Sequence, residues 1–235
     1  MREMGTDAGN RRPVRWGYDA DNGPAAWASL DPGFAACALG GEQSPVDLTG
    51  GRGADLRPLE FAYRKTRIVL ENTGHTVQAN PDPGSFVVLD GTRYDLRQFH
   101  FHHRSEHLFD GVRLALDLHL VHATGDGALA VVGILFEEGT MHAALAPLWA
   151  HLPAEPGASR ALPGEFDIAA LLPARGTAWR YRGSLTTPPC TEGVAWAVLA
   201  EPLAMSAGQI AAFAALYPNN CRPVQPLGER VLRIG

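Results

Sequence analysis

Three histidines lie where two neighbouring β-strands could hold one metal ion. The first candidate strand reads Gln98-Phe99-His100-Phe101-His102. Side chains alternate faces along a strand, so His100 and His102 share one side and the phenylalanines take the other. The second candidate strand, residues 114–121, carries His119 on one face, with leucines packed behind it. Two imidazoles from one strand and one from its neighbour could therefore face a single point.

The connection between these strands contains Asp110-Gly111, a turn signal, which favours an antiparallel pair. Three imidazoles without a fourth protein ligand leave one position open for water, which is typical of a catalytic rather than a structural zinc. The alternative for each residue taken singly is an ordinary histidine, hydrogen-bonded at the edge of a core.

Polar residues at matching positions could orient these histidines. Gln98 precedes His100 by two residues, and Asp117 stands in the same relation to His119. Each could hold the ring nitrogen that does not face the metal; the alternative is a polar rim around a pocket. Glu106 lies in the loop that leaves the first strand. By composition alone, the hydroxyl-rich stretch 183–190 is merely a loop.

Length and composition indicate one large soluble domain with a substantial core, since the chain has 235 residues. A net charge of −5 with scattered basic residues argues against a nucleic-acid partner. No apolar run approaches the roughly 18 residues that span a bilayer, so no membrane insertion is expected. Residues 1–12 are polar and contain no recognisable secretory signal.

The three cysteines form no close pair of the C-x-x-C kind, so a cysteine zinc site is not expected. Their odd number leaves either three free thiols or one bridge and one thiol.

Strands dominate the predicted secondary structure. Frequent glycine and proline mark many turns, and only residues 141–152 and 207–216 have helical spacing, the second after the possible cap Ser206. Residues 153–164 read as a loop. The β-like runs are 66–71, 76–80, 85–89, 92–101, 112–122, 128–136, 178–181 and 193–199. The expected class is α+β, mainly β: one domain built on a large, mostly antiparallel sheet.

The order of motifs resembles the α-class carbonic anhydrases of bacterial type. The resemblance runs from Trp16 to the C-terminus, and it implies a flexible tail at 1–15 and one domain at 16–235. It also implies a central twisted sheet of about ten strands, with a zinc ion at the bottom of a cone-shaped cleft. The blocks are Trp16-Gly17-Tyr18, Gly23-Pro24 with Trp27, Gln43-Ser44-Pro45-Val46-Asp47-Leu48, the strand 98–102 with Ser105-Glu106-His107, Leu118-His119-Leu120-Val121-His122, Gly183-Ser184-Leu185-Thr186-Thr187-Pro188-Pro189, and Arg222-Pro223-Val224-Gln225-Pro226.

The resemblance implies reversible hydration of carbon dioxide to bicarbonate and a proton, by attack of a zinc-bound hydroxide. His100, His102 and His119 match the Zn²⁺ ligands, with Gln98 and Asp117 as their hydrogen-bond partners. Asp117 stands where glutamate is usual. Because it is one methylene shorter, its contact with His119 is expected to be longer or water-mediated.

Further matches assign the remaining roles. Thr186 matches the hydroxyl that accepts a hydrogen bond from the zinc-bound hydroxide, and Glu106 the carboxylate that receives the threonine proton. His75 matches the proton shuttle. Thr187 matches a residue that helps bind bicarbonate. The matches to the water path are Tyr18, Thr73 and Gln78, and those to the apolar wall for carbon dioxide are Val121, Val131, Leu185 and Trp196.

Two histidines, His107 and His122, match buried structural positions, and strand alternation puts the rival ligand His103 on the wrong side. Cys37 and Cys190 match the disulfide of exported members, which implies a periplasmic or secreted protein and leaves Cys221 as a free thiol.

The expected assembly is a monomer or homodimer. Two rival functions stay open: a binding module that has lost activity, and a zinc hydrolase acting on esters, which could also be a secondary activity of the same site.

Overall fold

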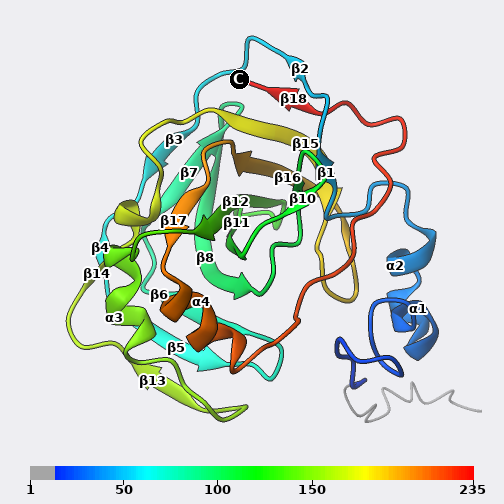
Figure 1. Cartoon of the computed structure of the whole chain (residues 1–235). Helices are drawn as coiled ribbons and strands as arrows, with labels where there is room; N and C mark the ends of the chain where they lie inside the picture. Colours follow the sequence, from blue (N-terminus) through cyan, green and yellow to red (C-terminus); the bar gives the residue numbers. More distant parts are fainter. Residues whose placement is uncertain (1–13) are drawn as a thin grey trace, which may run out of the picture.

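A large sheet forms the centre of the computed structural model, which describes residues 14–235. Thirteen strands form it, and ten of them follow one path in the order β13-β5-β6-β8-β11-β12-β16-β15-β18-β2 (Figure 1). Strand β17 pairs with β12, and β7 links β3 to β8. The strands are β2 (Arg52–Gly53), β3 (Glu60–Ala62), β5 (Ile68–Asn72), β6 (Val77–Pro81), β7 (Phe86–Leu89), β8 (Thr92–His102), β11 (Leu116–Ala123), β12 (Leu129–Glu138), β13 (Ser159–Ala161), β15 (Ala178–Ser184), β16 (Glu192–Leu199), β17 (Leu203–Met205) and β18 (Arg233–Ile234).

Small elements surround this sheet. β1 (Asp47–Leu48), β9 (Leu108–Phe109) and β10 (Val112–Arg113) form a three-stranded sheet, and β4 (Lys65–Thr66) pairs with β14 (Phe166–Asp167). The α-helices are α1 (Trp27–Leu30), α2 (Ala36–Leu39), α3 (Ala146–Trp149) and α4 (Ala207–Ala214), and 3₁₀ turns span Pro32–Phe34, Ala143–Leu145 and Ile168–Leu171. Helices α1 and α2 lie beside the sheet rather than across it (Figure 1).

The expected fold class is confirmed, although the sheet is mixed. Most strand pairs are antiparallel, but β12 runs parallel to both β16 and β17, and β18 runs parallel to β2. The tail predicted at 1–15 lies almost wholly outside the described residues, so that boundary stays a prediction. Within residues 14–235, no helix is long and apolar enough to cross a bilayer.

Several predicted boundaries change in the structure. Residues 112–122 form two strands, β10 and β11, because β10 turns back on β9 across Asp110-Gly111. Residues 141–152 hold only a 3₁₀ turn and the single-turn helix α3. The loop predicted at 153–164 was wrong in part, since it contains β13. All three β13 residues are exposed and pair with β5 through the backbone, so no apolar alternation marks them.

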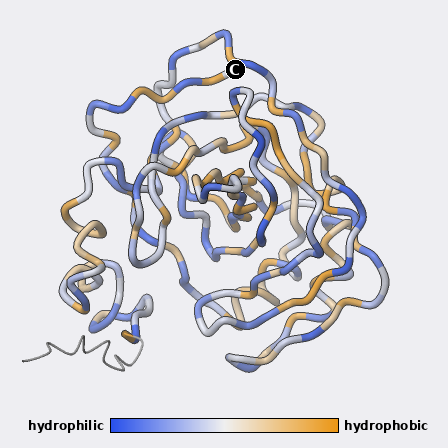
Figure 2. The backbone as a smooth tube through the Cα atoms, turned by 180° about the vertical axis from the view of Figure 1, so that it is seen from behind, coloured by the Kyte–Doolittle hydropathy of each residue, from blue (hydrophilic) through white to orange (hydrophobic). Residues whose placement is uncertain are grey.

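The β8–β11 pair has a core on one face and the candidate site on the other. Phe99, Phe101, Leu118 and Leu120 are fully buried in the larger hydrophobic core, on the face opposite the candidate histidines. Hydrophobic stretches gather in the strands at the centre of the molecule (Figure 2). The alternation read from the sequence therefore assigns the side chains of β8 and β11 to the core or to the site.

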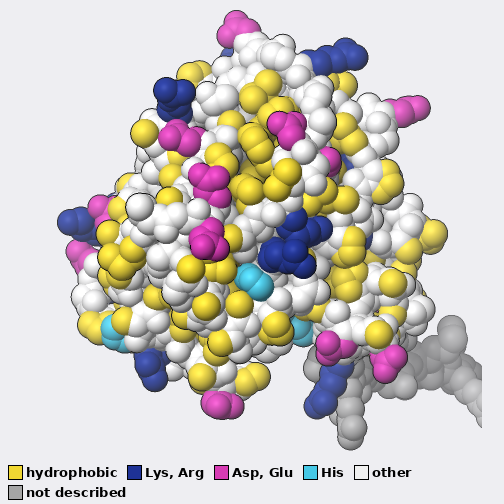
Figure 3. All heavy atoms as spheres, viewed as in Figure 1, with side chains coloured by type: hydrophobic (Ala, Val, Ile, Leu, Met, Phe, Trp, Pro, Cys, Tyr) yellow, Lys and Arg dark blue, Asp and Glu magenta, His cyan; other side chains and the backbone are white. Residues whose placement is uncertain are grey.

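On the surface, basic and acidic side chains are interspersed over the face shown in Figure 3.

Candidate metal centre

The three histidines meet as the strand pattern predicts. β8 and β11 are antiparallel, with His100 opposite His119 and His102 opposite Asp117. One nitrogen from each of His100, His102 and His119 lies within 4.8 Å of the others. His102 and His119 are each only 1% exposed, whereas His100 is half-buried. The cluster therefore lies at the bottom of an opening rather than on the surface.

Hydrogen bonds orient two of the three rings. His100 Nδ1 donates to Gln98 Oε1 at 2.8 Å, and His102 Nδ1 donates to the backbone carbonyl of Asn220 at 2.7 Å. Both acceptors are oxygens that cannot donate, so each ring carries its proton on Nδ1 and has a lone pair on Nε2.

His102 Nε2 is buried and has no hydrogen-bond partner among residues 14–235. An orphaned nitrogen of this kind needs an explanation, and a bound cation provides one. Burial, followed by the charges of His102 and His119, holds the pKa of His100 well below its usual range, and burial also lowers the pKa of His102. Neutral imidazoles are the form that binds zinc, so the donor set fits a three-histidine zinc site.

Asp117 contacts His119 directly. Its Oδ2 lies 3.1 Å from His119 Nε2, which leaves no room for the bridging water that the sequence allowed. The contact lacks hydrogen-bond geometry, since His119 Nε2 has no hydrogen-bond partner within residues 14–235. The same oxygen accepts the backbone N–H of Glu106 at 3.2 Å. The shorter side chain reaches because the loop backbone lies against it and holds the carboxylate in place.

The two rival histidines do not enter the three-histidine cluster. His107 is fully buried, as predicted; its Nε2 bonds the Tyr181 hydroxyl at 2.7 Å, and its Nδ1 is 3.6 Å from Asp117 Oδ2. Within the described residues, the second potential ligand group is His107 with Asp117 and His119, so it shares His119 with the first. His103 lies beyond the end of β8, and its Nδ1 bonds the carbonyl of Pro218 at 2.9 Å.

Glu106 is fully buried beside the cluster. Its Oε1 accepts the backbone N–H of Arg222 at 2.8 Å, and its Oε2 lies 3.5 Å from His102 Nε2. Burial raises the pKa of Glu106, while the charge of His119, the Arg222 N–H and the nearby Thr186 hydroxyl act in the opposite direction. Glu106 Oε2 has no hydrogen-bond partner among residues 14–235, so the hydrogen bond expected from Thr186 stays a prediction.

Two cavities open onto the histidines and share Gln98, His100 and Thr187 as lining residues. The first, about 360 Å³, is largely apolar and contains all four predicted wall residues. The second, about 230 Å³, contains His75 and the predicted water-path residues, whose hydroxyl, amide and imidazole groups lie in a lining that is also mostly apolar. The first is lined by Arg97, Gln98, His100, His119, Val121, Leu129, Val131, Leu185, Thr186, Thr187 and Trp196. The second is lined by Trp16, Tyr18, Thr73, His75, Thr76, Gln78, Gln98, His100, His102 and Thr187.

Comparison with known proteins agrees with this geometry. The family model for eukaryotic-type carbonic anhydrases matches residues 22–234. A carbonic anhydrase of Pectobacterium carotovorum is 40% identical over 220 residues, which cover 93% of this chain and 90% of that protein. The chain belongs to the α-class carbonic anhydrases.

Solved structures of α-carbonic anhydrases show the same fold. The enzyme of Thermovibrio ammonificans, solved with the inhibitor sulfanilamide, superposes with a TM-score of 0.92 at 38% identity, covering 94% of this chain and all of that one. The α-carbonic anhydrase of Photobacterium profundum gives a TM-score of 0.89 at 39% identity, covering 93% and 100% of the two chains.

His75 lies half-exposed in the second cavity of this α-carbonic anhydrase. Its ring stacks on Trp16, with centroids 3.7 Å apart and planes 7° from parallel. Its backbone N–H donates to the Thr73 hydroxyl in a turn where Gly74 has φ = 83°, a conformation that favours glycine. Burial lowers the pKa of His75 from its ordinary value.

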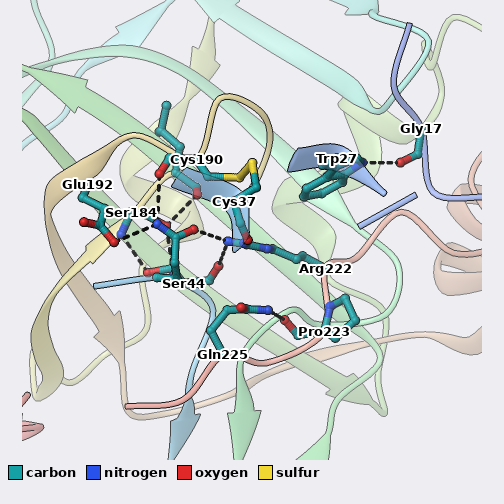
Figure 4. Close-up of a disulfide and its surroundings, with 12 residues drawn as sticks. Gly17, Trp27, Cys37, Ser44, Ser184, Cys190, Glu192, Arg222, Pro223 and Gln225 are labelled. Atoms are coloured by element: carbon teal, nitrogen blue, oxygen red, sulfur yellow. Dashed lines mark hydrogen bonds between the residues drawn. A yellow bond between two sulfur atoms is a disulfide. The ribbon is translucent and has the colours of Figure 1, made fainter. Parts of the chain in front are cut away.

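The disulfide between Cys37 and Cys190 is present, as predicted, and joins residues 153 positions apart (Figure 4). Cys221 is the free, buried thiol. Next to the bridge, the buried guanidinium of Arg222 donates to the carbonyl of Cys37 at 2.7 Å and of Ser44 at 2.6 Å. The bridge therefore lies in the hydrogen-bonded region that also holds Glu106.

The sequence reasoning missed several residues of the site. Asn220 orients His102 through a backbone carbonyl, and Arg222 holds Glu106 through a backbone N–H. Because every residue type has a backbone carbonyl and every type but proline has an N–H, no side-chain pattern could have found them. Arg97 was also missed, because strict alternation places it on the core side of its strand.

Proposed function

We propose that this protein is a zinc enzyme that hydrates carbon dioxide reversibly to bicarbonate and a proton, with His100, His102 and His119 as the zinc ligands. The observation that carries this proposal is the buried Nε2 of His102, which has no hydrogen-bond partner in the described part of the chain and lies next to two further imidazoles where the two cavities meet. The family relationship supports the same reaction.

A zinc ion held there supplies a Lewis acid; carbonic anhydrase is itself the standard example of such an ion lowering the pKa of a coordinated water to about 7, a value that belongs to the family rather than to this structure.

Thr186 and Glu106 would select the hydrogen-bonding state of the attacking oxygen. In this proposal Thr186 donates its O–H to Glu106 Oε2, which has no other hydrogen-bond partner among residues 14–235, so the threonine oxygen presents only lone pairs to the cleft. It can then accept a hydrogen bond from an attacking O–H group but can donate none. A ligand without a proton to donate is disfavoured at this position.

The apolar cavity suits a small, neutral gas. Val121, Val131, Leu185 and Trp196 line it, and they offer carbon dioxide an apolar surface from which water is readily displaced. Thr187 lines both cavities and could hold bicarbonate as it forms.

His75 would carry the released proton out of the second cavity. Tyr18, Thr73 and Gln78 line that cavity with His75 and could order a chain of waters. Neutral imidazole accepts a proton, and the lowered pKa of His75 keeps the ring neutral to lower pH than an exposed histidine.

The disulfide supports a periplasmic or secreted location, because such bridges persist in oxidising compartments. The expected assembly, a monomer or homodimer, and the secondary esterase activity stay predictions.

The decisive test pairs zinc content with stopped-flow hydration kinetics. His102→Ala should lose zinc and activity together, whereas His103→Ala, at the adjacent histidine that is directed away, should retain both. Thermal unfolding of each variant checks that both fold. An active wild-type protein without zinc, or stoichiometric zinc in His102→Ala, would contradict the proposed site. A zinc-loaded wild type that hydrates no carbon dioxide would favour the binding-module alternative.

A further inference from the structure

A bulge interrupts strand β8 just before the metal-facing residues. Val121 of β11 pairs with Gln98, but the next residue, His122, pairs with Leu96, so Arg97 is an extra residue without a partner on β11. The other edge of β8 changes at the same place. β7 pairs with residues 92–95, whereas β6 pairs with residues 99 and 100.

This bulge decides where Arg97 points. Under strict alternation Arg97 would share the face of Phe99 and Phe101, where an unpaired charge would be buried in the larger core. The extra residue lets Leu96 take the core side, where it is 5% exposed, while Arg97 lines the apolar cavity. Bulges commonly re-aim a side chain in this way next to active sites.

Arg97 also differs in charge from its neighbours in the cleft. Among the side chains that line the two cavities, within residues 14–235, it is the only arginine or lysine, and no aspartate or glutamate lines either cavity. Its side chain is exposed, and its guanidinium has no hydrogen bond or ion pair within the described part of the chain. The rim of the apolar cavity therefore carries one uncompensated positive charge.

We propose that Arg97 is a specificity-determining residue that favours small monovalent anions, the product bicarbonate included, over neutral carbon dioxide in the cleft. The inference rests on the proposed function, because it concerns the ligands of that same site. A fixed positive charge attracts an anion through the Coulomb interaction, but carbon dioxide has no net charge and gains little from it. Arg97 would thus make the enzyme more sensitive to its product and to simple anions.

The effect of Arg97 should be measurable as a higher affinity of the cleft for anions. The ratio of kcat/KM for hydration to kcat/KM for dehydration is fixed by the reaction equilibrium, so no substitution can change it. The informative quantity is the inhibition constant of a non-reacting anion, divided by the KM for carbon dioxide. For Arg97→Gln this quotient should rise about three- to tenfold at low ionic strength, and the difference should shrink as ionic strength increases and the Debye length falls.

The experiment uses the zinc-loaded enzyme and nitrate as the probe. Arg97→Lys tests whether charge alone restores the affinity. Arg52→Gln is the matched control, since it changes the net charge by the same amount. Arg52 is exposed in β2, which ends the strand path and is separated from β8 by β11, β12, β16, β15 and β18. Nitrate titration of the cobalt-substituted proteins, followed by visible absorption, measures anion affinity without turnover.

Weaker nitrate binding in Arg97→Gln, with recovery in Arg97→Lys and no change in Arg52→Gln, supports the proposal. Equal nitrate affinity in wild type and Arg97→Gln at low salt, or an equal loss in Arg52→Gln, overturns it. Either overturning result in an enzyme that still hydrates carbon dioxide leaves the proposed function standing. A wild type without hydration activity refutes that function instead.

Discussion

Asp117 is held more tightly than its short side chain suggests. The carboxylate is fully buried, and one of its oxygens contacts both His119 and the backbone N–H of Glu106. Although burial raises the pKa of Asp117, the neighbouring rings of His119 and His107 hold it well below its usual range. A negative charge behind His119 makes that imidazole a stronger metal ligand.

Removing this charge should weaken metal binding. We expect Asp117→Asn to lose about 10- to 100-fold in zinc affinity, because outer partners of ligating histidines have effects of that size. Competition with a chelator measures the affinity. Asp117→Glu keeps the charge and is the matched variant, so it should bind zinc more tightly than Asp117→Asn. Equal affinities for both variants would mean that the charge does not act on His119.

Replacing His75 should separate proton export from the chemical step. His75→Ala is expected to lower kcat by about 100-fold in dilute buffer, within the range of general acid–base catalysis, with a smaller effect on kcat/KM. Stopped-flow kinetics measure both, and added imidazole should restore kcat because a diffusible base replaces the side chain. A parallel loss in kcat/KM that imidazole does not repair would contradict the shuttle role.

The pH profile follows from the direction of the His75 pKa. The neutral ring is the proton acceptor, and burial lowers the pKa below the ordinary 6.5. In dilute buffer, kcat for hydration should therefore stay near its plateau as pH falls through 6.5 and decline only at lower pH. A midpoint of kcat above 6.5 would be inconsistent with His75 as the limiting acceptor.

At the scale of elements, the β8–β11 pair shows what can be predicted from the sequence. Alternation in residues 98–102 and 114–121 predicts the cluster of three histidines, because the period of two assigns each side chain to a face. Resemblance to the family adds Glu106 and Thr186, which composition alone does not single out. Neither approach predicts the bulge at Arg97, because its position depends on how β8 exchanges partners. The short strand β13 could not be predicted either, because its exposed residues pair with β5 through the backbone alone and leave no side-chain pattern.

A buried histidine on the core side of β11 should make stability depend on pH. Burial lowers the pKa of His122 to about 4, and its Nε2 bonds the Tyr63 hydroxyl at 2.7 Å. Between pH 6.5 and 4 the unfolded chain binds a proton at this residue that the folded chain does not. The free energy of unfolding should therefore fall as pH decreases through this window, by up to about 3 kcal/mol.

Urea unfolding of the metal-free protein at several pH values tests this dependence. His122→Gln should flatten the slope between pH 4 and 6.5, and His151→Gln, which also removes one histidine, should not. The difference between variants isolates His122 from the three metal-site histidines. An unchanged slope in His122→Gln would show that folding does not lower the pKa of this residue.

For the molecule as a whole, the disulfide restrains the unfolded chain over most of its length. Its residues are 153 positions apart, so loop-closure reasoning predicts that reduction lowers the free energy of unfolding by roughly 4–5 kcal/mol. Urea unfolding with and without reductant measures this change. A thiol count in denatured, unreduced protein should give one, from Cys221; a count of three would remove the argument for an oxidising compartment.

The contacts of Asn220 and Arg222 have a consequence for the order of synthesis. The carbonyl that orients His102 lies 118 residues later in the chain, and the N–H that holds Glu106 lies 116 residues later. A nascent chain that has already completed β8 and β11 still lacks both groups. All three histidines therefore exist on the ribosome well before the centre can be finished, and the capacity to turn over substrate should arise late, as one event.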